Sequence, residues 1–210
     1  MNSDVTSLPF GPLGRSAFHI CVDMQRIFLE PGPWFGPPGL EIIPNICALA
    51  DHAADRVLFT RFITAQDADH AKGAWQRYYR HWDAVTQQKA GSEILRLHSD
   101  LARRARAENV YDKITHDAFD NPAFGMRLAE EGATTVVLSG VETDVCVLAT
   151  ALSAVDLGYR VIIATDAVAS SAPASHDACL AHVYPRFDQQ VELALTADII
   201  AQWSLSCPSS

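Results

Sequence analysis

The chain has 210 residues, of which 49% are hydrophobic and 20% are charged, and its formal net charge is -9. This composition excludes disordered, collagen-like and coiled-coil proteins, and the length fits one α/β domain over residues 1–210. The acidic excess argues against nucleic acid as a partner, because binding to phosphates needs a basic surface. We therefore expect an ordinary globular protein.

The N-terminal segment and the cysteines indicate where such a protein would work. The chain has no run of 18 apolar residues, and its first twenty residues carry Pro9 and Pro12 instead of an apolar segment. We expect neither a signal peptide nor a membrane span. The cysteines are odd in number and form no C-x-x-C pair, which favours a reducing, cytoplasmic compartment. They are Cys21, Cys47, Cys146, Cys179 and Cys207.

The first third of the chain alternates apolar runs with helical periodicity. The run AFHICV at residues 17–22 predicts a strand buried on both faces. Residues 31–39 are rich in Pro and Gly and predict a rigid loop. A helix is predicted over residues 44–54 and a second strand over residues 56–62.

The middle of the chain holds a segment of different character. Residues 64–89 are polar and rich in aromatic side chains, so we expect an insert, with a helix over 74–85, in a position to cap a pocket. An amphipathic helix is predicted over residues 92–106, and a short third strand over 109–112 runs into Lys113.

The last part of the chain resumes the alternation. Asn121 and Pro122 predict the start of a helix that ends at Gly132, while Thr143 and Ser175 are the expected N-caps of two further helices. Strands alternating with helices predict a mostly parallel sheet between helices, a three-layer α/β/α Rossmann-like fold. The remaining predicted strands cover residues 134–139, 160–165 and 190–195, and the helices cover 143–157, 175–183 and a short final segment.

Three polar residues lie at the expected carboxyl ends of strands, where ligands bind in such folds. Asp23 follows the first strand, Lys113 the third, and Cys146 lies just past the fourth. A helix N-terminus favours the thiolate of Cys146 over the thiol, and a carboxylate can accept the thiol proton and return it. The set predicts nucleophilic catalysis, with backbone N–H groups around Glu142 and Cys146 stabilising the negative charge on a carbonyl oxygen.

Three motifs carry a resemblance to a known family. VDMQ at residues 22–25 followed by Phe28, the Asp112-Lys113 pair and, most specifically, SGVETDVCV at 139–147 resemble the isochorismatase-like cysteine hydrolase superfamily. Its members include nicotinamidases and N-carbamoylsarcosine amidohydrolases, and the likeness extends from about residue 17 to residue 203. It implies a six-stranded parallel sheet and a triad in which Asp23 is the general base and acid, Lys113 the electrostatic partner and Cys146 the nucleophile.

The resemblance also implies details around the triad. The Val141-Glu142 peptide bond is expected to be cis, with the Glu142 and Cys146 amides forming an oxyanion hole. Asp117 stands four residues after Lys113, where many members have Ser. The expected substrate contacts are Gln25, Phe28, Trp34, Asp117 and Val141.

No metal or other cofactor is expected. Metal-dependent members carry an Asp-x-His pair and a further His after the second strand, and the segment with Asp67, Asp69, His70 and His81 does not reproduce that spacing. The sequence also lacks the glycine-rich motifs that bind nucleotides. Because members commonly form dimers or tetramers, a homo-oligomer is expected.

Three functions stay open at this level. The first is hydrolysis of a C–N amide-type bond in a small-molecule substrate through a covalent Cys146 intermediate. The second is hydrolysis of the vinyl ether of isochorismate, which resembling members generally perform without the nucleophilic cysteine. The third is a catalytically silent protein that binds a small molecule in the same pocket. The presence of Cys146 favours the first.

Overall fold

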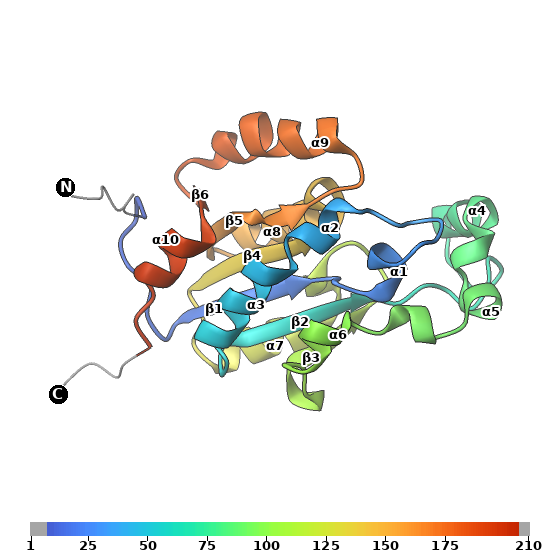
Figure 1. The fold of residues 1–210 in the computed structure, drawn as a ribbon, viewed down its shortest axis with the longest axis horizontal. Helices are drawn as coiled ribbons and strands as arrows, with labels where there is room; N and C mark the ends of the chain where they lie inside the picture. Colours follow the sequence, from blue (N-terminus) through green and yellow to red (C-terminus); the bar gives the residue numbers. More distant parts are fainter. Residues whose placement is uncertain (1–7, 206–210) are drawn as a thin grey trace.

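A computed structural model describes residues 8–205, and Cys207 lies outside them. A six-stranded sheet with every neighbouring pair parallel runs through the molecule in the order β3-β2-β1-β4-β5-β6 (Figure 1). The predicted six-stranded parallel α/β fold is therefore confirmed. The strands are β1 (Ala17–Val22), β2 (Val57–Phe62), β3 (Val110–Lys113), β4 (Thr135–Val141), β5 (Arg160–Ala169) and β6 (Val191–Ala194).

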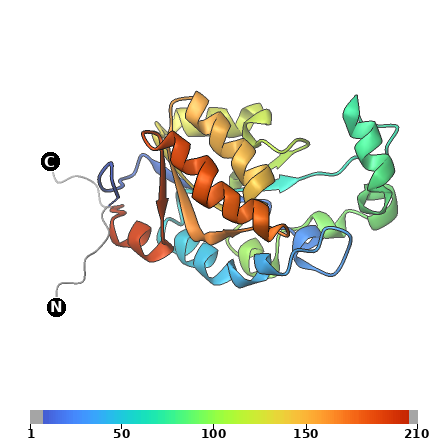
Figure 2. The ribbon, with the colours of Figure 1, turned by 90° about the horizontal axis from the view of Figure 1, so that it is seen from above.

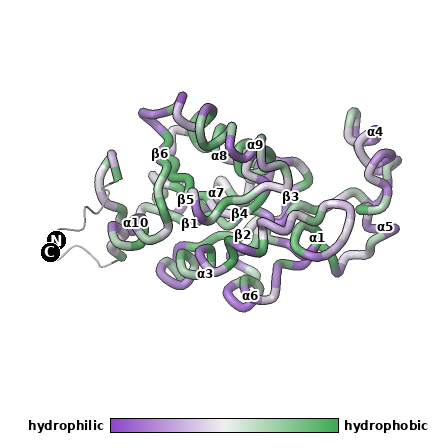
Figure 3. The backbone as a smooth tube through the Cα atoms, turned by 45° about the horizontal axis from the view of Figure 1, so that its top comes forward, coloured by the Kyte–Doolittle hydropathy of each residue, from purple (hydrophilic) through white to green (hydrophobic). Residues whose placement is uncertain are grey.

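The two central strands, β1 and β4, are buried along their whole length. In β1, Phe18, Ile20 and Val22 belong to one hydrophobic cluster, whereas Ala17 and Cys21 belong to the other. Alternate side chains therefore pack on opposite faces of the sheet, which explains why this strand is apolar without interruption. Figure 3 shows hydrophobic residues along the inner strands and hydrophilic stretches on outer helices such as α6 (Ser99–Ala102).

Helices cover both faces of the sheet (Figure 2). On one face, α3 packs Ile46 and Leu49 onto the strands; on the other, α7 contributes Phe124 and Leu128. The layer on the α3 side contains α1 (Arg26–Leu29), α2 (Pro38–Glu41), α3 (Ile43–His52), α6 and α10 (Thr196–Ala201). The layer on the α7 side contains α7 (Pro122–Glu130), α8 (Leu148–Asp156) and α9 (Pro173–Ala178).

A two-helix arm extends beyond the carboxyl ends of the strands (Figures 1 and 2). It contains α4 (Ala74–His81) and α5 (Gln87–Ala90) and corresponds to the polar, aromatic-rich insert expected from the sequence. The short 3-10 segments are η1 (Asp83–Val85), η2 (Glu93–Leu95), η3 (Ala107–Asn109), η4 (Ala118–Asp120) and η7 (Tyr184–Phe187), and π-helical turns form η5 (Thr143–Val147) and η6 (Cys179–Val183).

The long helix predicted over residues 92–106 is wrong. The segment forms only η2 and α6, with extended backbone between them. Leu97 makes an isolated bridge with Gln25, and the Arg96 carbonyl accepts a hydrogen bond from the Arg26 N–H. Leu95 and Leu101 are buried as the helical pattern required, but long-range pairing takes the backbone groups that a helix would have used.

Two expected helix caps are also wrong. The helix that carries Cys146 begins at Thr143 and has Glu142 at its N-cap without a side-chain cap; α9 begins at Pro173, two residues before Ser175. The Asn121 cap is confirmed, because its side chain accepts a hydrogen bond from the Ala123 N–H. Within residues 8–205, every helix is too short or too polar to cross a lipid bilayer.

Candidate active site

Asp23 and Lys113 form a buried ion pair at the carboxyl ends of β1 and β3. Lys113 Nζ lies 2.7 Å from Asp23 Oδ2, and the side chains are 1% and 0% exposed. The ammonium also donates hydrogen bonds to the carbonyl oxygens of Thr115 (3.0 Å) and His116 (2.9 Å). One carboxylate oxygen and two carbonyl oxygens thus surround the ammonium, which offsets part of the cost of burying the charge.

Thr60 of β2 holds the other side of the Asp23 carboxylate. Its hydroxyl donates to Asp23 Oδ1 at 2.7 Å and accepts from the Asp23 N–H at 3.2 Å. Among residues 8–205, Asp23 is the only non-glycine residue with a left-handed φ, at 52°. This conformation turns the chain at the end of β1, and Asp tolerates it better than most residues.

Cys146 lies in the first turns of the helix that follows β4 and is 5% exposed. Its sulfur is 3.8 Å from His116 Nδ1 and interacts with the side chains of Asp23 and Lys113. Burial and the Asp23 carboxylate raise the pKa of Cys146, and Lys113 lowers it by less. These contacts oppose the stabilisation of the thiolate that the helix N-terminus is expected to give, which stays a prediction.

The charges of the neighbouring groups follow from the same contacts. Burial lowers the pKa of Lys113, but Asp23 and Cys146 outweigh it, so that the net shift is upward and the ammonium stays charged. Burial and the Lys113 charge lower the pKa of His116, which keeps its imidazole neutral at neutral pH. We call Asp23, Thr60, Lys113 and Cys146 the floor of the site.

The turn between β4 and the Cys146 helix contains the cis peptide bond Val141-Glu142, as the resemblance implies. The Glu142 carbonyl accepts hydrogen bonds from the N–H groups of Val145 and Val147. Just before this turn, Gly140 has a φ of 110°, and a Cβ there would lie 2.0 Å from the Val22 carbonyl oxygen. Only glycine permits β4 to approach β1 this closely.

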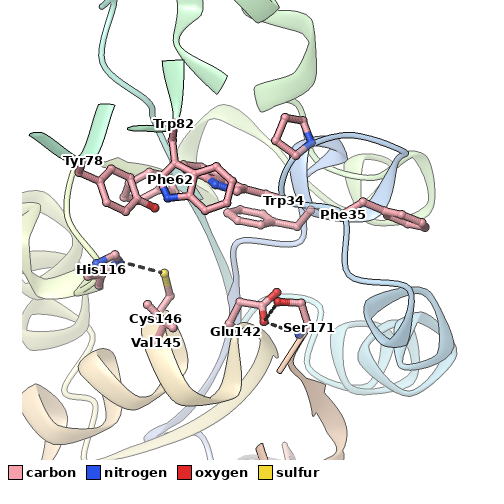
Figure 4. Close-up of a pocket in the computed structure, with 12 residues that line it drawn as sticks. Trp34, Phe35, Phe62, Tyr78, Trp82, His116, Glu142, Val145, Cys146 and Ser171 are labelled. Carbon is pink, nitrogen blue, oxygen red and sulfur yellow. Dashed lines mark hydrogen bonds between the residues drawn. The ribbon is translucent and has the colours of Figure 1, made fainter. Parts of the chain in front are cut away.

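A cavity of about 350 Å³ adjoins Cys146, large enough for a small molecule (Figure 4). Opposite the sulfur lie five aromatic side chains, which we call the roof. Trp34 is at their centre: its ring centroid is 5.8 Å from Phe28, 5.9 Å from Tyr78 and 6.1 Å from both Phe62 and Trp82. The cavity is lined by Phe28, Pro33, Trp34, Phe35, Phe62, Tyr78, Trp82, His116, Glu142, Val145, Cys146 and Ser171.

Two of the five expected substrate contacts, Phe28 and Trp34, line the cavity, and three do not. The Gln25 side-chain amide is hydrogen-bonded to backbone groups. Its Nε2 donates to the carbonyls of Phe62 and Leu95, and its Oε1 accepts from the Phe62 N–H. These bonds direct the side chain to the end of β2 and not to the cavity, and the expected substrate contact stays a prediction.

Asp117 and Val141 are likewise placed elsewhere. Asp117 caps η4, accepting hydrogen bonds from the Phe119 N–H (2.9 Å) and the Ser153 hydroxyl (2.6 Å). Val141 is buried beside Gly39 of the loop over residues 31–39. Neither side chain lines the cavity, and both expected substrate contacts stay predictions.

Several lining residues have no signal in the sequence. His116 is a single histidine outside any recognisable spacing, and it reaches the cavity because the chain turns back over Lys113. The Glu142 side chain is a second addition: its backbone was expected at the site, and its carboxylate also lines the cavity. Ser171 comes from beyond β5, a strand that extends further than its apolar run predicts.

Within residues 8–205, no three side chains of His, Cys, Asp or Glu are arranged to hold a metal ion. The exposed His70 makes a 2.8 Å contact with Asp67 instead. A homo-oligomer and independence from a cofactor stay predictions.

A parallel α/β sheet with a thiol, a carboxylate and an ammonium at its strand ends defines the chain as an α/β protein with a candidate site at the carboxyl edge of the sheet. The isochorismatase domain model matches residues 17–194. The chain belongs to the isochorismatase family, whose members include hydrolases such as nicotinamidases and amidohydrolases.

Individual relatives agree with this assignment. Nicotinamidase 3 of Arabidopsis thaliana is 26% identical over 80% of this chain and 81% of its own. Maleamate amidohydrolase of Pseudomonas putida is 26% identical over 85% and 84%. The match to the isochorismatase family protein YecD of Escherichia coli O157:H7, 35% identical, spans 33% of this chain and 37% of that protein. A cysteine hydrolase structure from Pseudomonas syringae superposes with a TM-score of 0.76 and 23% identity over 94% and 97% of the two chains, which shows the shared fold.

Proposed function

We propose that the protein hydrolyses a C–N amide-type bond of a small molecule through a covalent intermediate on Cys146. One observation carries the proposal: the buried ion pair of Asp23 and Lys113 contacts the only cysteine that lines the cavity among the described residues. A nucleophile, a proton acceptor and a fixed positive charge are thus adjacent at the cavity. The two full-length amide-hydrolysing relatives support the same bond type.

The reaction begins with proton transfer from the Cys146 thiol to Asp23 while Sγ attacks the substrate carbonyl. A C–S bond forms, and the oxyanion accepts hydrogen bonds from the Glu142 and Cys146 amides, each worth about 3 kcal/mol of transition-state stabilisation. Asp23 then protonates the leaving nitrogen as the C–N bond breaks, which leaves a thioester. Lys113 holds the carboxylate in place and keeps its charge compensated throughout.

The second half of the reaction uses the same groups in reverse. Water attacks the thioester carbonyl while Asp23 takes its proton, the C–S bond breaks, and the proton returns to Sγ. The raised pKa of Cys146 suits this cycle, because the enzyme begins and ends with a neutral thiol and ionises it only as the carbonyl is attacked.

Substitution of Cys146 by Ala tests the proposal directly. A panel of small primary amides is assayed for ammonia release, and intact-mass spectrometry follows an acyl adduct that maps to Cys146. We expect Cys146→Ala to lose turnover and the adduct, and the matched control Cys179→Ala, a buried cysteine that does not line the cavity, to retain both. Residual amidase activity in Cys146→Ala overturns the mechanism, and isochorismate turnover indifferent to Cys146 supports the vinyl-ether reaction.

A second variant separates the base from the nucleophile. Asp23→Asn removes the charge that raises the pKa of Cys146 and leaves Lys113, which lowers it. We expect amide turnover to fall at least about a hundredfold while alkylation of Cys146 by iodoacetamide at neutral pH becomes faster. Slower alkylation in this variant would contradict the assigned roles.

A further inference from the structure

Among the residues that line the cavity, Glu142 is the one with a formally charged side chain. His116 and Cys146 also line the cavity, and we treat both as neutral. Its Oε2 accepts hydrogen bonds from the Ser170 hydroxyl (2.7 Å) and from the Ser171 N–H and hydroxyl. Oε1 has no hydrogen-bond partner among residues 8–205. Figure 4 shows the carboxylate between Cys146 and Ser171, beneath the roof.

The Glu142 carboxylate is held from two sides. Ser170 is 4% exposed, and its hydroxyl also lies 2.7 Å from Asp144 Oδ1. On the other side, a Cβ at Gly36 would lie 3.3 Å from Glu142 Oε1, so the loop over residues 31–39 packs closely against the carboxylate. A negative charge is thus held in a fixed orientation with one oxygen left to accept a hydrogen bond or an ion pair.

The surrounding charges leave this carboxylate uncompensated. Lys113 is paired with Asp23 and does not line the cavity. Arg77 lines an adjoining hollow on the other side of Tyr78 and Trp82, and no Arg or Lys is among the residues that line the cavity itself. The cavity therefore has a net negative charge, which disfavours any substrate that carries a carboxylate of its own.

The roof favours the same kind of ligand. Phe28, Trp34, Phe62, Tyr78 and Trp82 surround the cavity with aromatic rings, and the faces of such rings attract cations through their quadrupoles. An aromatic enclosure combined with one carboxylate is well suited to an organic ammonium group, which needs both apolar contact for its methyl or methylene groups and a counter-charge.

Building on the function proposed above, we infer that the cavity selects cationic amides: small molecules in which an alkylammonium group lies close to the carbonyl that Cys146 attacks. Glu142 Oε1 is the counter-charge, and the roof encloses the ammonium group. Glu142 is thus a specificity-determining residue through its side chain, in addition to the proposed role of its amide.

Three probes of similar size and different charge test the inference. Betaine amide carries a trimethylammonium group, 3,3-dimethylbutanamide is its neutral isostere, and succinamate is an anionic comparison. Binding is measured by isothermal titration calorimetry to the Cys146→Ala protein, so that turnover plays no part. We expect betaine amide to bind about tenfold more tightly than the neutral isostere, and succinamate to bind least tightly.

Variants assign the preference to one residue. In the Cys146→Ala protein, the further substitution Glu142→Gln keeps the size of the side chain and an oxygen that accepts from Ser170. It should bring the affinity for betaine amide to within about twofold of that for the neutral isostere. The matched control Asp144→Asn removes a carboxylate that contacts the same Ser170 hydroxyl but does not line the cavity, and should keep most of the preference.

The outcomes separate this inference from the proposed function. Equal binding of the cation and its isostere, tighter binding of succinamate, absence of betaine amide binding, or a preference unaffected by Glu142→Gln would overturn the inference. The wild-type protein is then assayed for ammonia release from the same amides. A charge preference in binding without turnover of any amide by the wild type would count against the proposed amidase function and leave the selectivity intact.

Discussion

The floor and the roof of the site lie on opposite sides of the same cavity and are built in different ways. The floor takes Lys113 and Asp23 from the ends of β3 and β1, Thr60 from within β2, and Cys146 from the helix after β4. These four strands are neighbours in the sheet. Its side chains are buried and linked by directional polar contacts. The roof takes its rings from loops, from α1, from the end of β2 and from the α4 arm, and its contacts are between rings.

This difference assigns separate tasks to the two regions. Parallel neighbouring strands set the distances in the floor to a fraction of an ångström, which proton transfer and nucleophilic attack require. Ring contacts in the roof are weakly directional, and Phe62 joins the two regions, since its ring centroid lies 5.1 Å from Lys113 Nζ. On the proposed function, the floor carries out the reaction, and the roof, together with Glu142, selects the molecule that undergoes it.

The largest expected effect is on stability, from a substitution where β4 approaches β1 next to the floor. Gly140→Ala places a Cβ 2.0 Å from the Val22 carbonyl oxygen and forces β4 away from β1. We expect a loss of at least about 4 kcal/mol in the free energy of unfolding or no soluble protein, measured by urea denaturation.

The control for this variant is Gly158→Ala, which shares the positive φ but has open space around the added Cβ. It should cost only about 1–2 kcal/mol. Equal losses in the two variants would show that the close approach of β4 to β1 contributes nothing beyond backbone conformation.

Removing one partner of the buried ion pair should have the next largest effect. Lys113→Met leaves the Asp23 carboxylate buried without its counter-ion, which is expected to cost about 3–5 kcal/mol in urea denaturation. Adding Asp23→Asn to the same protein removes the lone charge and should restore part of this loss. A double variant no more stable than Lys113→Met alone would mean that the pair is not electrostatically coupled.

His19 of β1, the strand that ends before Asp23, makes the free energy of unfolding depend on pH. Burial lowers its pKa from 6.5 to about 3, and its Nε2 lies 2.7 Å from the Ser139 hydroxyl. Because only the unfolded chain takes up a proton between these values, this contribution to stability is complete above about pH 6.5 and decreases as the pH falls toward 3. Lowering the pH from about 7.5 to about 5 should cost roughly 2 kcal/mol, and His19→Gln should lose that dependence. A pH dependence that His19→Gln leaves unchanged would locate the titrating group elsewhere.

The smallest effect concerns the roof. Trp34→Leu removes the ring that contacts the other four roof residues while leaving the floor untouched. We expect KM for an accepted amide to rise about tenfold with kcat changed less than about threefold, because binding is weakened and the reacting groups keep their geometry. The control is Trp75→Leu, since Trp75 is an aromatic residue of α4 that contacts Tyr78 but does not line the cavity; it should change KM less. A kcat loss in Trp34→Leu as large as the KM change would show that floor and roof are not separable.

Local pattern was sufficient for much of this molecule. Apolar runs predicted the inner strands, shorter segments predicted β3 and β6, and helical periodicity with an Asn-Pro start predicted α7 together with its cap. Because parallel strands end at one edge of a sheet, Asp23, Lys113 and Cys146 were candidates for one site before any coordinates. The same logic overestimated the helix over residues 92–106, where buried leucines have the right spacing but the backbone of Arg96 and Leu97 pairs with another segment.

The sequence alone thus determined the fold, the family and the set of candidate site residues, because these depend on periodicity and on motifs within short stretches of chain. Only the tertiary structure decided that Gln25 supports β2, that burial raises the pKa of Cys146, and that His116 and Glu142 line the cavity. These properties depend on which distant groups share a small volume and how far water is excluded from it. A one-dimensional pattern contains neither quantity.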